Sequence, residues 1–301
     1  MNFKEELKTY QKYVNEKLQE SINYDKCPEE VLNASAEYSL MAGGKRIRPI
    51  LILATYKMLS KDENCNFEKC IPYIVSMEMI HNFSLIHDDL PGIDNDDIRH
   101  GKLTNHKAFN EATAILAGDK LLNGAYNNIS NYICEKINNH EDVINDMKAL
   151  QQLTYATDRM IIGEYIDTES EDKEIPVELL NYIHENKTGA LIEASVKIGA
   201  LLANASNGDL ERVLNYAKKI GLAFQIKDDI LSEIGDEKVM GKPVGNDKKK
   251  KKSTYVSMYG VDLAKDILEK IIFEAIDSIN IYKEKSEFLK NLAIYIKDRE
   301  K

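Results

Sequence analysis

Apolar residues recur at helical spacing through most of this 301-residue chain. Near its start, Phe3, Leu7, Tyr10, Val14 and Leu18 follow one another at intervals of three or four residues, which places them on one face of a helix. The same rhythm returns in residues 71–90, 112–137, 143–166, 176–204, 210–234 and 263–301. No stretch alternates with the period of two that a half-buried strand needs, so the pattern predicts an all-helical protein.

Proline and loop signals favour one continuous domain. Five of the six prolines stand where a helix can begin or end, and Pro91 alone lies within an acidic stretch. Polar residues 62–66 and 169–174 are predicted to be connections, and the sequence contains no Ser/Gly-rich linker or long repeat. We therefore expect a single domain over residues 1–301, built from about ten or more helices.

Composition narrows the class of protein. A hydrophobic content of 43% is enough for a sizeable core, and 50 acidic against 40 basic residues give a net charge of -10. That charge disfavours general binding to nucleic acid or to anionic membranes, and no apolar run reaches the roughly 18 residues of a membrane span. We expect a cytoplasmic enzyme without a signal peptide, with four reduced and mostly buried cysteines.

Two acidic clusters indicate metal chemistry. Residues 88–97 read DDLPGIDNDD and follow an apolar helical segment, which a solvated loop alone does not explain. The second cluster ends the apolar helix GLAFQIKDDILSEIG and contains Asp228, Asp229, Glu233, Asp236 and Glu237. Mg²⁺ prefers one or two protein carboxylates, with substrate phosphate and water completing its octahedron. The two clusters together predict Mg²⁺ ions held over a diphosphate.

Basic residues fit the same substrate. Gly43, Gly44, Lys45, Arg46 and Arg48 form a glycine turn with three cations, which is either a phosphate cradle or a turn with surface charges. Other cations follow the acidic clusters or lie mid-chain: Arg99, His100, Lys102, Lys187, Lys242 and the run 248–252. The lysine run is predicted to be mainly a solvated loop. Four aromatic residues are expected in the core: Tyr126, Tyr155, Tyr165 and Phe224.

Four motifs in their order identify a family resemblance. They are GGKRIRP at 43–49, SLIHDDLPGIDNDDIRHGKLTNHKAF at 84–109, ENKTGALIEA at 185–194 and AFQIKDDIL at 223–231. The chain resembles short-chain trans-prenyl diphosphate synthases, and bacterial farnesyl diphosphate synthases in particular. The resemblance implies an isoprenoid-synthase-type helical bundle around a deep central cavity, one polyprenyl synthetase domain and a homodimer.

The resemblance also implies an activity. An allylic substrate, dimethylallyl or geranyl diphosphate, would be ionised with the help of three Mg²⁺ ions and would alkylate isopentenyl diphosphate to give farnesyl diphosphate (C15). Stabilising the departing diphosphate and the carbocation is then the main catalytic task.

Each implied role falls on a residue of the motifs. The metal ligands would be Asp88, Asp94 and Asp228. The allylic diphosphate or its metals would contact Arg99, Lys187, Gln225 and Lys242, with Thr188 and Gln225 oxygens facing the carbocation. The catalytic set is thus Asp88, Asp94, Lys187, Thr188, Gln225 and Asp228. Isopentenyl diphosphate would be bound by Gly44, Lys45, Arg48, His81 and His100, with Lys252 as the closing-loop lysine.

Product length in such enzymes depends on the residues below the first aspartates, here Phe83 and Ser84. Phe83 lies roughly 7.5 Å below Asp88 by helix rise, and its ring is predicted to stop growth at C15. An ordinary core role for Phe83 is the alternative. Asp88 and Asp94 point about 120° apart on an ideal helix, so we expect Pro91 to introduce an irregularity that brings them together.

Three departures from the family pattern keep alternatives open. Ser232 replaces the third carboxylate of the second region, His100 replaces an arginine, and Glu164 stands in a run that often reads GGQ. Ser232 and His100 make a catalytically impaired diphosphate-binding subunit an alternative function. A geranylgeranyl diphosphate synthase (C20) is a nearer alternative, which depends on the chain-length residues. A metal phosphohydrolase built on His81, His87 and Asp88 is a third, but it leaves the second cluster unexplained.

Overall fold

The computed structural model describes residues 2–22, 28–61, 65–234 and 253–299. Helices make up nearly all of the regular structure in these residues, which confirms the all-helical prediction. Backbone contacts group the chain into two compact units, Met1–Leu53 with Asp62–Gln151 and Ala54–Lys61 with Gln152–Lys301. The single-domain expectation for residues 1–301 stays a prediction.

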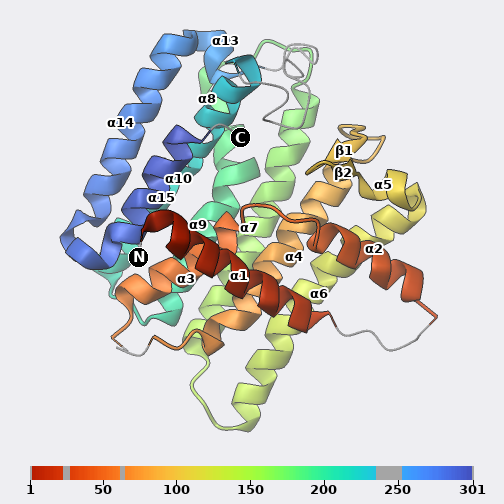
Figure 1. The fold of residues 1–301 in the computed structure, drawn as a ribbon, viewed down its shortest axis with the longest axis vertical. Helices are drawn as coiled ribbons and strands as arrows, with labels where there is room; N and C mark the ends of the chain where they lie inside the picture. The colour runs from red at the N-terminus through yellow and green to blue at the C-terminus, as the bar shows by residue number, and fades with distance from the viewer. Residues whose placement is uncertain (1, 23–27, 62–64, 235–252, 300–301) are drawn as a thin grey trace. The chain divides into compact units, whose positions relative to one another are not determined.

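The first unit is built around the buried helix α4. Its elements are α1 (Phe3–Ser21), α2 (Glu30–Leu40), the 3₁₀ turn η1 (Glu68–Cys70), α4 (Ile71–Asp88), β1 (Ile98–Arg99), β2 (Lys102–Leu103), α5 (Asn105–Ala108) and α6 (Glu111–Asn138). Helices α3 (Ile47–Leu59) and α7 (Ile144–Glu169) begin in this unit and end in the second. Because α4 packs against α1, α2 and α6, apolar residues surround it on several faces (Figure 1).

Polar contacts fix α4 against α6. The Ser76 hydroxyl donates to the Ala125 carbonyl at 2.8 Å, and the Asn128 amide donates to the Pro72 carbonyl at 2.9 Å. Near the end of α4 the helices approach closely, because a Cβ atom at Gly118 would lie 2.2 Å from the His87 ring. The end of α4, where the first acidic cluster begins, is thereby held in place.

A buried guanidinium joins three other parts of this unit. The Arg46 side chain is 3% exposed and donates to Glu78 of α4 at 2.6 Å, to Asn15 of α1 at 3.0 Å and to the Leu40 carbonyl at 2.8 Å. Buried charges are tolerated when they are paired and hydrogen-bonded, as here. Arg46 therefore belongs to the core, and the expectation that it helps to cradle a phosphate is wrong.

The second unit is built around α10. Its elements are α8 (Val177–His184), the π-helical turn η2 (Glu185–Gly189), α9 (Ala190–Leu202), α10 (Asn207–Ile234), α13 (Tyr255–Tyr259), α14 (Val261–Ile279), η3 (Asn280–Ser286) and α15 (Glu287–Asp298). Helix α10 packs against α9, α14 and α15 (Figure 1). The buried Tyr216 hydroxyl donates to the Leu289 carbonyl at 2.7 Å and so ties α10 to α15.

Two predicted helices are interrupted. Residues 176–204 contain the π-helical turn η2, and residues 263–301 are broken at η3, where Lys283 has φ 51° and ψ -125°. A single hydrophobic period runs through both breaks, so sequence periodicity did not reveal them. The structure also contains a short hairpin in which Ile98 pairs with Leu103 and Arg99 with Lys102. Strands of two residues are too short to produce an alternating pattern.

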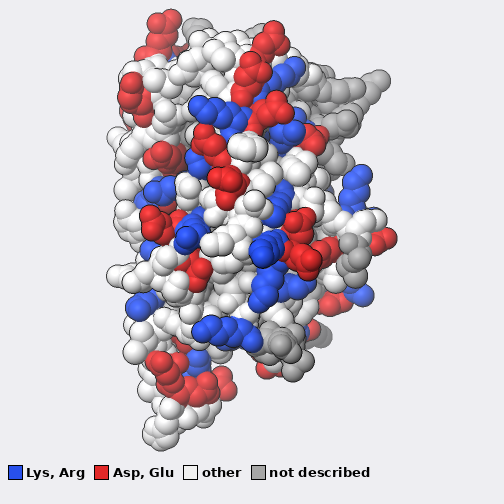
Figure 2. All heavy atoms as spheres, turned by 90° about the vertical axis from the view of Figure 1, so that its left-hand side faces the viewer, with Lys and Arg blue, Asp and Glu red and all other residues white. Residues whose placement is uncertain are grey.

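Some residues expected inside are exposed. Tyr155 and Tyr165 of α7 are 60% and 64% exposed, so their assignment to the core is wrong. Cys70 is buried as expected, whereas Cys134 is exposed and Cys65 is intermediate, and all three are free thiols. Acidic and basic side chains are interspersed on the side that carries α14 (Figure 2). Among the described helices, none combines the length and the apolar character required to cross a membrane.

The Arg46–Glu78 pair generates a stability prediction. Replacing Arg46 with Met leaves the Glu78 carboxylate buried without its charge partner, so we expect the free energy of unfolding to fall by about 3–5 kcal/mol. Urea denaturation measures this change.

Lys17→Met is the matched control, because Lys17 pairs with Glu20 at 2.6 Å at the surface. Its loss is expected to change the free energy of unfolding far less, because water and salt screen an exposed pair. An equal effect of the two substitutions would contradict the structural role of Arg46.

Candidate active site

The first acidic cluster forms a tight turn after α4. Helix α4 ends at Asp88, and the Asp94 backbone N–H donates to the Asp88 carbonyl at 2.8 Å. The Leu90 carbonyl accepts from the N–H groups of Ile93 and Asn95, at 2.9 and 3.1 Å. The backbone of Asp94 thus returns to the backbone of Asp88, while the convergence of their carboxylates on one metal site stays a prediction. Helix α4 ends before Pro91, so a turn after the helix, and not an irregularity within it, brings the backbones of Asp88 and Asp94 together.

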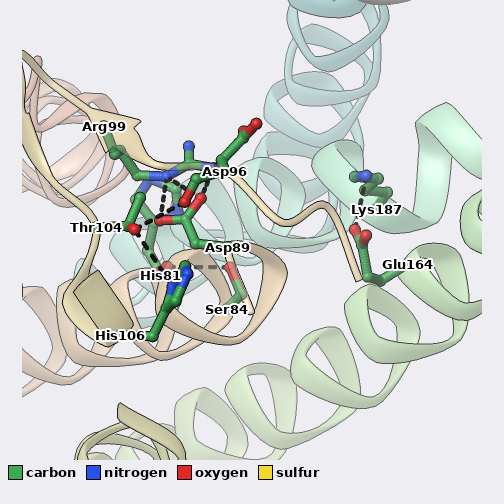
Figure 3. A network of polar contacts seen from close by, with 9 residues as sticks. All are labelled: His81, Ser84, Asp89, Asp96, Arg99, Thr104, His106, Glu164 and Lys187. Atoms are coloured by element: carbon green, nitrogen blue, oxygen red, sulfur yellow. Dashed lines mark hydrogen bonds and ion pairs between the residues drawn. The ribbon is translucent and has the colours of Figure 1, made fainter. Parts of the chain in front are cut away.

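The second aspartate of the cluster has a different environment. Asp89 is 3% exposed, and Arg99 Nε lies 2.8 Å from both of its carboxylate oxygens, with Arg99 Nη2 2.5 Å from Oδ1 (Figure 3). Burial raises the pKa of the Asp89 carboxyl, and the Arg99 hydrogen bonds oppose that rise. Arg99, expected to bind the allylic diphosphate, also anchors the β1–β2 hairpin to the end of α4.

The glycine turn places cations near this cluster. Gly44 has φ 111°, a conformation open to glycine at little cost, and a Cβ atom there would lie 3.8 Å from His100 Nε2. Arg48 Nη1 lies 3.0 Å from His81 Nε2. Because a guanidinium only donates, His81 Nε2 accepts this hydrogen bond. Of the residues expected to bind isopentenyl diphosphate, Arg48 and His81 are thus in direct contact, and His100 lies near Gly44.

The electrostatics of this part of the site suit an anion. Burial and then the charge of Arg48 lower the pKa of His81 well below its usual value. Partial desolvation and then Arg99 lower the pKa of His100. Arg99 also interacts with Asp88 and Asp89 at the end of α4. It therefore stands between the carboxylate turn and the cation-rich loop of the first unit.

The His-Asp metal centre of the phosphohydrolase hypothesis finds no support. His87 Nε2 lies 3.0 Å from the Ile115 carbonyl, and His81 Nε2 accepts from Arg48. Among the described residues, no group of three or more His, Cys, Asp or Glu side chains is arranged to hold a metal ion. This finding covers the described carboxylates of both acidic clusters as well, so Mg²⁺ there would take further ligands from substrate phosphate and water.

In the second acidic cluster, Asp228 and Asp229 contact different partners, both in the second unit. Asp229 is 9% exposed, and its Oδ2 accepts from the Tyr255 backbone N–H at 2.7 Å, which fixes the start of α13 to α10. Asp228 Oδ1 lies 2.7 Å from Arg299 Nη2, and the Arg299 guanidinium lies 4.1 Å from the centre of the Phe224 ring.

Sequence reasoning missed the role of Arg299. Its guanidinium neutralises the aspartate expected to bind Mg²⁺ in the second cluster. A basic residue 71 positions beyond Asp228 gives no local signal in the sequence. Only the packing of α15 against α10 brings the two side chains together.

Lys187 lies in the π-helical turn η2, with its ammonium nitrogen 2.7 Å from both Glu164 Oε2 and Asp167 Oδ2 of α7. In the same turn Thr188 is buried, and Gln225 of α10 is half-buried. π-Helical turns are rare and occur frequently at functional sites.

Several predicted site residues lie outside the described residues. They are Lys242, Lys252 and the rest of the lysine run 248–252, together with Asp236 and Glu237 of the second cluster.

Gly163 is the contact point between α7 and η2. A Cβ atom at Gly163 would lie 2.2 Å from the Lys187 backbone nitrogen. We therefore expect Gly163→Ala to force the two segments apart, lowering the melting temperature by several degrees and weakening diphosphate binding. Thermal unfolding and calorimetric titration with Mg²⁺ and inorganic diphosphate measure the two effects.

Gly124→Ala in α6 serves as control, because its nearest neighbour would be Met79 Sδ at 4.0 Å. Alanine favours a helix by about 1 kcal/mol over glycine, so this variant should be as stable as the parent or more so. If Gly163→Ala behaved like Gly124→Ala, the close approach would not matter.

Sequence comparisons with known proteins identify the family of this chain. The polyprenyl synthetase family model matches residues 29–291. A farnesyl diphosphate synthase of Micrococcus luteus is 41% identical over 270 residues, covering 90% of each chain. A geranylgeranyl diphosphate synthase of Cyanophora paradoxa is 44% identical over 268 residues, covering 88% of this chain and 86% of that one.

Solved structures that resemble this chain carry the same kind of name as its sequence relatives. The apo structure of an FPP/GFPP synthase from Zymomonas mobilis superposes with a TM-score of 0.84 at 31% identity, covering 98% of this chain and 99% of that one. The residues that the family model matches include the acidic turn after α4, the turn η2 and the helix α10. The chain belongs to the polyprenyl synthetase family.

Proposed function

We propose that this protein is a chain-elongating prenyltransferase that condenses isopentenyl diphosphate with dimethylallyl or geranyl diphosphate to give farnesyl diphosphate. One observation carries the proposal: in the first unit, Arg99 hydrogen-bonds Asp89 in the aspartate turn, and the adjacent His100 lies beside Gly44 of the glycine turn. A site with carboxylates on one side and cations on the other suits one diphosphate bound through metal ions and another bound directly.

The donor set fits Mg²⁺. Asp88 and Asp94 are brought together by the turn after α4, and Asp228 stands near the end of α10. One or two carboxylates per site are what this ion takes from a protein when phosphate oxygens supply further ligands. We assign these three aspartates as Mg²⁺ ligands, and Asp228 would have to give up its contact with Arg299 to serve as one. Bound Mg²⁺ supplies charge neutralisation for the departing diphosphate.

The remaining chemistry falls to the chain itself. As the allylic C–O bond breaks, its electron pair leaves with the diphosphate, whose charge Lys187 helps to balance. The Thr188 hydroxyl and the Gln225 carbonyl present oxygen dipoles to the allylic cation. The double bond of isopentenyl diphosphate, held by Lys45 and Arg48, attacks that cation, and a proton is then lost. Neutral His81 positions the Arg48 guanidinium by accepting its hydrogen bond.

Exposed apolar side chains support a homodimer. Leu116 of α6 and Ile161 of α7 are about half exposed, and Tyr155 and Tyr165 of α7 are exposed further. Large apolar side chains that face water on neighbouring helical turns are typical of protein–protein interfaces. A second copy of the chain is the partner proposed for these faces.

A turnover assay tests the proposal. Purified protein with Mg²⁺ and labelled isopentenyl diphosphate receives dimethylallyl, geranyl or farnesyl diphosphate in separate reactions, and dephosphorylated products are separated by chromatography. A C15 product from the first two, with little from the third, is expected. Elongation of farnesyl diphosphate would favour the C20 alternative. Elongation in none of them would favour the impaired subunit suggested by His100 and Ser232.

Phe83 provides a test of product length. Its buried ring contacts the His87 ring edge-on at a centroid distance of 5.0 Å, and Phe83 lies about one and a half turns before Asp88. We expect Phe83→Ala to open space below the metal ligands and shift the product from C15 to C20 or longer. Product chromatography measures the shift, and Phe83→Leu, a smaller change in volume, keeps the test usable if the alanine variant is unstable.

Phe288→Ala is the matched control, since Phe288 is a buried phenylalanine of α15. Truncation costs about 3–5 kcal/mol at either site, but only the Phe83 variant should change the product. An unchanged C15 product from both Phe83 variants would assign that ring to ordinary core packing.

A further inference from the structure

Lys187 is held between two carboxylates of one helix. Its ammonium nitrogen lies 2.7 Å from both Glu164 Oε2 and Asp167 Oδ2, as Figure 3 shows for Glu164. The three side chains are between 15% and 25% exposed, so water screens these pairs less than it screens pairs at the surface. The group carries two negative charges and one positive charge.

The backbone leaves Lys187 little freedom to move away. Because Gly163 has no side chain, α7 lies directly on the π-helical turn that carries Lys187. One turn earlier, Arg159 donates to the Asn186 side chain at 2.8 Å and to the Glu185 carbonyl at 3.0 Å. Helix α7 therefore fixes η2 on both sides of Gly163. Glu164, the next residue, meets Lys187 through this fixed packing.

This arrangement has a consequence for anion binding. A diphosphate that approaches Lys187 competes with two carboxylates that already hold the ammonium at hydrogen-bonding distance. Glutamine at position 164 would keep an oxygen acceptor for Lys187 and remove one negative charge. The charge of Glu164, more than its ability to accept a hydrogen bond, then adds to that of Asp167 in weakening the attraction of Lys187 for an anion.

We propose that Glu164 is a positioning residue that holds Lys187 and weakens its attraction for the allylic diphosphate. The proposal rests on the function proposed above, which makes Lys187 a contact of that diphosphate. Glu164 thus keeps affinity for the allylic substrate, and for the released diphosphate, below what Lys187 alone would give.

The test compares Glu164→Gln with the parent enzyme. Calorimetry with Mg²⁺ and inorganic diphosphate is expected to give about five-fold tighter binding, the size of a partly screened ion pair. The KM for geranyl diphosphate should fall by a similar factor, while kcat changes by less than about two-fold. A merely structural role would instead lower the melting temperature and kcat without tightening diphosphate binding.

Glu193→Gln is the matched control. Glu193 lies in the neighbouring helix α9 and pairs with Arg159 at 3.3 Å, so it shares the surroundings of Glu164 without contacting Lys187. Its substitution should leave diphosphate affinity unchanged. Equal tightening in both variants would show a general charge effect and overturn the specific role of Glu164.

Lys187→Gln separates failure of this inference from failure of the proposed function. If Lys187→Gln weakens diphosphate binding but Glu164→Gln does not tighten it, the inference is wrong and the proposed function stands. If Lys187→Gln changes neither diphosphate binding nor elongation, the assigned contact itself is wrong. In the double variant, the effect of Glu164→Gln should disappear, because the two side chains act as one pair.

Discussion

The first unit depends on the burial of one charge. Arg46 joins α1, the end of α2 and α4, and it does so from within the glycine turn, next to Lys45 and two residues before Arg48. A buried guanidinium accepts few alternative positions, since each one would leave Glu78 uncompensated. Core packing therefore fixes the position of the glycine turn. It also fixes the backbone that carries Lys45 and Arg48.

Helix content and the two acidic regions were predictable from sequence because both depend on local pattern. Apolar spacing predicted α4, α6, α7 and α10 within a few residues of their observed ends. Pro91 predicted a break in the helix after Asp88, and the chain does turn there, with a backbone hydrogen bond from Asp94 to Asp88. Both features are determined by residues that lie close together in the sequence.

Contacts between distant segments were not predictable in this way. Arg299 reaches Asp228 across 71 positions, and the Arg46–Glu78 pair spans 32. Tyr155 and Tyr165 fit the apolar period of α7, yet they face water, because periodicity does not tell which side of a helix finds a partner. Gly163 packs directly against the π-helical turn η2, and hydrophobic spacing does not encode that contact.

The two aspartates of each Asp–Asp pair have different environments. In both acidic regions the second member is buried and holds backbone or hairpin structure, Asp89 through Arg99 and Asp229 through the start of α13. Counting acidic letters in such a motif therefore overstates the negative charge offered to a cation. In the first region, Asp97 is also matched by a lysine at 2.9 Å. Several of these acidic residues therefore stabilise the conformation of the segment that follows the motif, through hydrogen bonds and ion pairs.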